Sequence, residues 1–80
     1  MLEGQVLSIE KLYVRLLDEG TDVLRPVDGR LLPDGKYELI APPGYDPEYE
    51  TWEYPPGSVV SGRVESRQGR QCLVAYIEQV

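Results

Sequence analysis

The sequence predicts a small all-β domain in which five strands form a partly open barrel, built from two hairpins and a long loop. Apolar residues recur with a period nearer two than 3.6 along most of the chain. Strong turn signals separate the apolar runs, which are all short. The chain has 80 residues, which we interpret as one domain, residues 1–80, with a small core.

The first strand is predicted at residues 12–16, where every second residue is Leu or Val. A polar turn over residues 18–21 ends this strand and contains a glycine that can adopt a positive φ. A helix over residues 6–18 is the competing interpretation, although Lys11 would then place a charge on its apolar face.

The second strand is predicted over residues 23–32, as one long bent strand. Pro26 cannot donate to a strand ladder, so we expect it at a sheet edge or at a bend. A hairpin turn at Asp28-Gly29 would leave almost no strand after it, so we expect a β-bulge at Gly29 instead.

Pro33-Asp34-Gly35 is the strongest turn signal in the chain, because proline, aspartate and glycine each favour their turn position. It should join the bent strand to a third strand over residues 36–40. In that strand we expect Tyr37 and Leu39 to point inward.

A second hairpin should close the domain. The strands are predicted at residues 59–66 and 71–79, with a turn over residues 67–70 that contains a glycine. The apolar run 72–77 is typical of a central strand that is covered on both faces.

Residues 42–57 differ from the rest of the chain. They contain five of the seven prolines, three of the six tyrosines and the single tryptophan. They also carry four carboxylates, Asp46, Glu48, Glu50 and Glu53, and no basic residue. Long loops in small domains are usually functional or disordered.

We expect this loop to form a binding surface, because tyrosine and tryptophan dominate interface hot spots and carboxylates beside them favour cations. The predicted partner contacts are Tyr45, Glu48, Tyr49 and Glu50. Trp52 and Tyr54 are instead expected to fold back as a structural lid over the open end of the barrel. Whether Tyr45 and Tyr49 are exposed is left open.

The composition excludes several kinds of catalyst. The chain has no histidine and one cysteine, so catalysis by Ser-His-Asp or Cys-His groups and the usual zinc sites are unavailable. The acidic loop lacks the D-x-[DN]-x-[DN]-G pattern of a calcium loop. We therefore expect no enzyme activity, no metal and no cofactor, and we interpret Cys72 as a buried, inert thiol.

The net charge of −6 argues against nucleic-acid binding. Arg63, Arg67 and Arg70 form the nearest approach to a basic cluster, which we interpret as a solvated hairpin. No apolar stretch approaches the ~20 residues of a membrane span. Without a secretory signal or disulfides, a cytoplasmic location is expected.

Three stretches follow a pattern of V-x-L-x-x-E-G-T-x-V with R-P-V, then Y-x-L, then W-E-[FY]-P-P-G-x-V-V. They lie within residues 13–27, 37–39 and 52–60. This pattern resembles that of short bacterial proteins of unknown function. The chain departs from it at Leu24, where an aromatic residue is expected, and in a longer loop before Trp52. The resemblance implies a compact all-β domain and a structural Trp52, but no activity, ligand or catalytic residue.

The predicted barrel is also similar to SH3-like domains, whose aromatic and acidic grooves take proline-rich basic peptides. The usual SH3 sequence landmarks are missing, so the similarity concerns the fold alone.

We therefore expect a non-catalytic module that binds a protein partner with a basic surface. One alternative is an acidic inhibitor or nucleic-acid mimic, whose charge imitates phosphate and blocks a basic site. Another is a structural unit that forms homo-oligomers, in which the strand edge at residues 23–27 pairs between copies.

Overall fold

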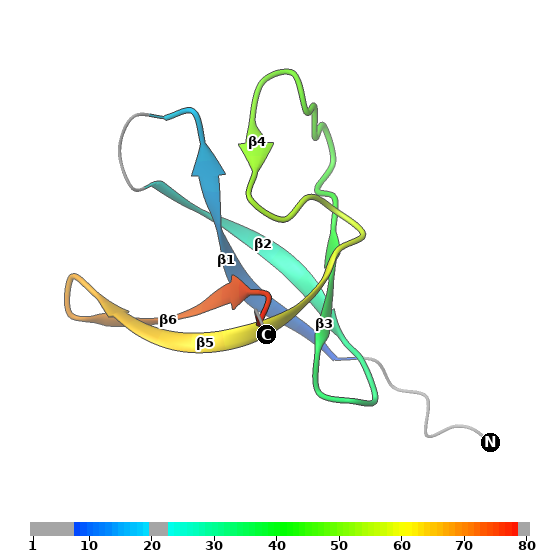
Figure 1. The fold of residues 1–80 in the computed structure, drawn as a ribbon, viewed down its shortest axis with the longest axis vertical. Coiled ribbons are helices and arrows are strands. Elements are labelled where there is room, and N and C mark those ends of the chain that lie inside the picture. The colour runs from blue at the N-terminus through cyan, green and yellow to red at the C-terminus, as the bar shows by residue number, and fades with distance from the viewer. Residues whose placement is uncertain (1–7, 20–22, 79–80) are drawn as a thin grey trace.

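Five strands close into a hydrogen-bonded ring in the computed structural model of the protein, which describes residues 8–19 and 23–78 (Figure 1). The six strands are β1 (Ile9–Leu17), β2 (Val23–Leu31), β3 (Tyr37–Ile40), β4 (Thr51–Trp52), β5 (Val59–Arg67) and β6 (Arg70–Tyr76). The ring runs β1-β2-β3-β5-β6 through antiparallel neighbours and returns from β6 to β1 in a parallel pair, while β4 lies on the outer end of β1. The predicted small, all-β barrel of five strands is thus confirmed.

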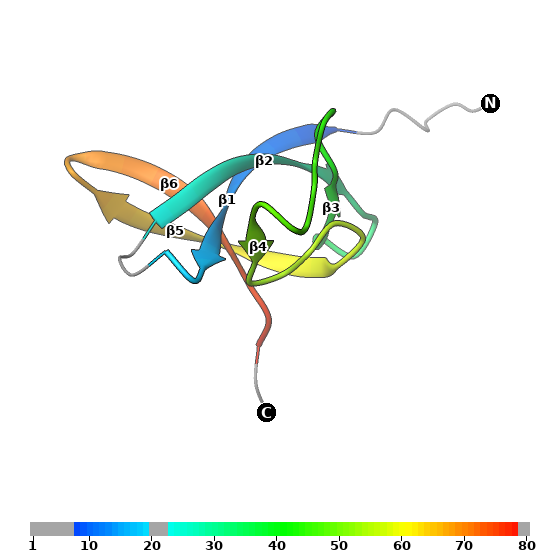
Figure 2. The same ribbon diagram turned by 90° about the horizontal axis from the view of Figure 1, so that it is seen from above.

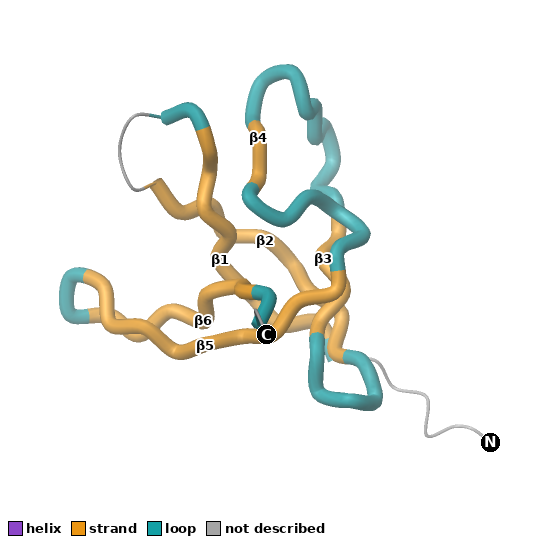
Figure 3. Tube along the Cα trace, in the orientation of Figure 1, coloured by secondary structure: helices purple, strands orange, loops and turns teal. Residues whose placement is uncertain are grey.

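Two long hairpins dominate this ring, which is closed only weakly elsewhere. β1 pairs with β2 over eight residue pairs, and β5 with β6 over seven. In contrast, β6 meets β1 at one pair, Tyr13 with Val74. The far ends of the two hairpins therefore diverge (Figures 1 and 3), although the view from above shows both on the same side of the ring (Figure 2). Among residues 8–19 and 23–78, no helix has the length and apolarity to cross a membrane.

The core forms on the inner faces of the strands. It consists of Leu12, Val14, Val27, Leu39, Trp52, Val60 and Ala75. Because side chains alternate along a strand, this set follows the period of two seen in the sequence. The predicted strand at residues 12–16 and the inward position of Leu39 are confirmed, whereas the helix over residues 6–18 is not formed in its described part.

The bulge predicted at Gly29 is wrong. Gly29 pairs one-to-one with Glu10 on one side and with Leu39 on the other, so no extra residue enters the strand. Glycine is needed for another reason, since a Cβ at this position would lie 2.5 Å from Leu12 Cδ1 and 3.2 Å from Tyr37 Cβ. A side chain at this position would therefore force Leu12 and Tyr37 to shift.

The position predicted for Pro26 is confirmed. β3 pairs with β2 only from Asp28 to Leu31, so no described strand lies on that flank of β2 at Pro26. The absence of an N–H on proline therefore removes no hydrogen bond between β2 and β3.

The first predicted hairpin turn is also confirmed. The N–H of Gly35 donates to the carbonyl of Leu32 at 2.9 Å, and the N–H of Leu32 donates to the carbonyl of Lys36 at 2.8 Å. Asp34 Oδ1 accepts a bond from the Lys36 N–H at 3.0 Å, and Gly35 has a φ of 88°. Asp34 thus stabilises the turn by accepting a backbone hydrogen bond, and Gly35 adopts the positive φ that the turn needs.

The second hairpin turns more tightly than expected. Gln68 and Gly69 have φ values of 52° and 79°, the two positive angles of a two-residue turn whose twist matches that of the strands. β6 ends at Tyr76, earlier than predicted. The expectation that residues 72–77 are covered on both faces holds only at Val74 and Ala75, because the other four are half-buried or exposed.

The close approach at Gly29 predicts that Gly29→Ala destabilises the protein by about 1–3 kcal/mol, as is usual for overpacking a core. Denaturant unfolding measures this loss. Combining it with Leu12→Val should reduce the cost of Gly29→Ala, because the nearest methyl group is removed. Equal costs in both backgrounds would contradict the steric explanation.

Candidate functional site

The tryptophan of the acidic loop lies in the core. Trp52 is 3% exposed and pairs with Leu16 where β4 meets β1. The ring of Tyr45 packs edge-on against it, with 5.0 Å between the ring centroids. Tyr54 packs against the same cluster, and its hydroxyl accepts a bond from the Ile77 N–H at 3.3 Å. Trp52 is thus part of the core and Tyr54 packs against it, and their role as a lid stays a prediction.

Two arginines hold the loop onto the first hairpin. Glu50 Oε1 lies 2.7 Å from Arg25 Nε and accepts a bond from Trp52 Nε1 at 2.8 Å. The contact with Arg25 is ionic, since the N–H is not aligned for a hydrogen bond. Glu53 lies 3.4 Å from Arg15 Nη1, and its N–H donates to the Arg15 carbonyl at 2.8 Å. Two of the four loop carboxylates are thus neutralised within the molecule.

A hydrogen-bonded turn shapes the outer end of the loop. The carbonyl of Asp46 accepts bonds from the N–H groups of Tyr49 at 3.0 Å and Glu50 at 3.2 Å. The Asp46 carboxylate accepts a bond from the Glu48 N–H at 2.9 Å. An aspartate that bonds to its own following backbone is a common way to fix a turn. Tyr49 projects from this turn with 85% of its surface exposed.

The four residues predicted to bind a partner divide into two pairs. Glu48 and Tyr49 are exposed side by side on the turn. Tyr45 and Glu50 are half-buried, and their side chains contact Trp52. This division could not be predicted from the loop alone, because it depends on Arg25, which lies on β2 and is far from the loop along the chain. Their role in binding stays a prediction.

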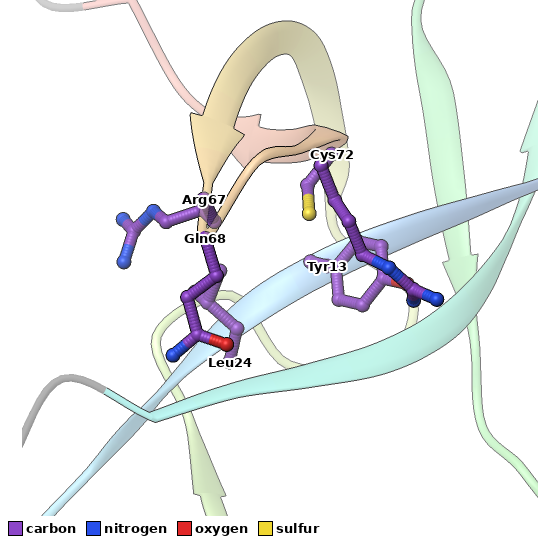
Figure 4. Close-up of a pocket in the computed structure, with 6 residues that line it drawn as sticks. Tyr13, Leu24, Arg67, Gln68 and Cys72 are labelled. Atoms are coloured by element: carbon purple, nitrogen blue, oxygen red, sulfur yellow. The ribbon is translucent and has the colours of Figure 1, made fainter.

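A pocket lies between the divergent hairpins, on the outer face of β1 and β2 (Figure 4). Its volume is about 330 Å³, and its lining comprises Tyr13, Leu24, Arg67, Gln68, Arg70 and Cys72. Cys72 was expected to be buried, but it is half-buried and lines this pocket, since β1 covers β6 only at Val74. The arginine cluster was the one sequence signal for this place, and it was interpreted as solvated surface.

Within the described parts of the chain, no group of three or more histidine, cysteine, aspartate or glutamate residues is placed to hold a metal ion. Comparisons with protein-family models, curated proteins and solved structures found no match. The resemblance to short bacterial proteins therefore stays a prediction, and the function must be inferred from the residues themselves.

The two tyrosines of the loop provide a matched test of this arrangement. Tyr45→Ala removes a ring that packs on Trp52 and should lower the free energy of unfolding by about 1–3 kcal/mol. Tyr49→Ala removes an exposed ring and should change it by less than about 0.5 kcal/mol. Thermal or denaturant unfolding of both variants measures the difference. Equal losses would contradict the placement of the two rings.

Proposed function

We propose that the protein is a non-catalytic module of the cytoplasm that binds a protein partner through the turn at residues 46–50. Tyr49 and Glu48 are the direct contacts, and Tyr45 and Glu50 hold the turn in position. The partner presents a basic surface.

The exposure of Tyr49 carries this proposal. Tyr49 is 85% exposed, although Trp52 of the same loop is buried and Tyr45 and Tyr54 are half-buried. Tyrosine offers a large contact area with only two side-chain torsions to fix, so it is favoured at the centres of interfaces. A ring left outside such a loop is the expected anchor of an interface.

The fixed backbone of the turn supports the same function. Binding is weakened when a loop must be ordered in the complex. Here the bonds to Asp46 and the ion pair of Glu50 already order the turn. A partner therefore meets Tyr49 in a defined position.

The charge on the turn indicates the chemistry of the partner. Neither Asp46 nor Glu48 forms an ion pair with a described residue, whereas Glu50 and Glu53 are paired with arginines. Within the loop, the negative charge available to a partner is thus concentrated beside Tyr49. Lysine or arginine can pair with these carboxylates, and arginine can also stack on the ring.

Tyr49→Ala should therefore abolish or strongly reduce partner capture while leaving the fold intact, because hot-spot aromatics commonly contribute 2 kcal/mol or more. The measurement is quantitative mass spectrometry of proteins captured from the native lysate by immobilised wild-type and variant protein. Val64→Ala is the matched control, since Val64 is 61% exposed but lies on the β5–β6 hairpin.

The wild type and Val64→Ala should enrich the same proteins, and Tyr49→Ala should lose them. Undiminished capture by Tyr49→Ala would refute the proposal. Capture that survives this substitution but falls steeply with salt would instead support the acidic mimic, which depends on charge spread over the whole surface.

A further inference from the structure

The pocket between the hairpins is built from two sheet faces that point toward each other. Tyr13 and Leu24 lie on the outer face of the β1–β2 hairpin, because the neighbouring positions Leu12 and Val14 face the core. On the opposite wall, Arg67 and Arg70 are paired across the hairpin, and Cys72 follows on the same face. Figure 4 shows Gln68 near Leu24 at one end of the pocket, and Cys72 with Tyr13 at the other.

This wall is the positively charged part of an acidic protein. The hairpin from Val59 to Tyr76 contains three arginines and one glutamate, in a chain of net charge −6. Glu65 lies 3.1 Å from Arg67 Nη2 and 3.6 Å from Arg63 Nε, so it is shared between those two. Arg70 forms no ion pair with a described residue. A cation is therefore available at the pocket.

The size and lining of the pocket fit a small molecule. Its volume of about 330 Å³ lies at the lower end of the range for small-molecule sites. One wall is largely apolar, with a leucine and an aromatic ring, and the other carries guanidinium and amide groups. Such sites characteristically combine apolar walls with a few polar groups that orient the ligand.

We propose that this pocket binds a small organic anion, whose carboxylate or phosphate pairs with Arg70 and whose apolar part lies against Tyr13 and Leu24. Gln68 supplies an amide for a second hydrogen bond to the ligand. The site shares no residue with the turn at residues 46–50, so it goes beyond the proposed function and can fail or succeed independently of it.

Cys72 provides a direct test, because it is the only cysteine of the chain and lines the pocket. Iodoacetate carries the negative charge that the proposal requires, and iodoacetamide is its neutral analogue. The ratio of their alkylation rates reports attraction of the anion alone, since both reagents depend equally on the thiolate fraction.

We expect a higher ratio of iodoacetate to iodoacetamide rates at Cys72 than at a free cysteine derivative. Arg70→Gln should lower the ratio by about three- to tenfold, as removal of one nearby unit charge implies. Arg63→Gln is the matched control, because Arg63 lies on the same hairpin but stacks 4.5 Å from the centroid of the Tyr76 ring and is not part of the lining. A ratio no higher than that of the free thiol, or equally lowered by both substitutions, would overturn the proposal.

Titration with phenyl phosphate, followed by backbone NMR, tests the apolar contact. We expect saturable shifts at Gln68, Arg70 and Cys72, binding that is tighter than for inorganic phosphate or phenol, and a loss of about tenfold or more in Arg70→Gln. Benzoate in place of phenyl phosphate shows whether the site prefers carboxylate or phosphate. Shifts confined to other parts of the molecule, or unchanged affinity in Arg70→Gln, would refute the site.

Discussion

The burial of Trp52 is the interaction on which the arrangement of the loop depends. The indole fills the core beside Leu16, and its N–H is satisfied by Glu50, which itself lies against Arg25. A buried indole without a partner for its N–H would be costly, so the carboxylate and the ring stabilise each other in this position. With Trp52 fixed, Tyr45 packs on its face and the turn that follows carries Tyr49 outward. One buried ring thus determines which aromatic residues of the loop remain available.

The same interaction changes how the charge of the chain should be understood. A net charge of −6 suggests a uniformly acidic surface, but the carboxylates are not equivalent. Glu50 and Glu53 are neutralised by arginines of β1 and β2, and only the carboxylates near Tyr49 remain unpaired in the loop. The arginines of the second hairpin form a separate, positive wall. The two proposed sites therefore bind ligands of opposite charge, and neither site could be inferred from the net charge of the chain.

How much the sequence predicts depends on whether a feature is local. The turn at Asp34 and Gly35 and the alternation around Val14 were predictable, because neighbouring residues determine them. The need for glycine at position 29 was not predictable, because it arises from a close contact with a methyl group of Leu12 on the adjacent strand. Nor was the partnership of Arg25 with Glu50, which depends on how the loop folds back. Within the acidic loop, the sequence could not separate the side chains that point inward from those that point outward, and the role of the loop in binding stays a prediction.

The pocket follows from a mismatch between the hairpins and the ring that they close. A core of this size engages only part of each long hairpin, and β6 meets β1 at a single pair. Beyond that point the twist of each two-stranded ribbon separates the hairpins, because twist is greatest in such ribbons. Tyr13 and Leu24 on one ribbon and Arg70 and Cys72 on the other are then left facing a gap that no core residue can fill. A small barrel with long hairpins thus produces a cleft at its side without any insertion, and the residues on the facing outer surfaces determine what the cleft can bind.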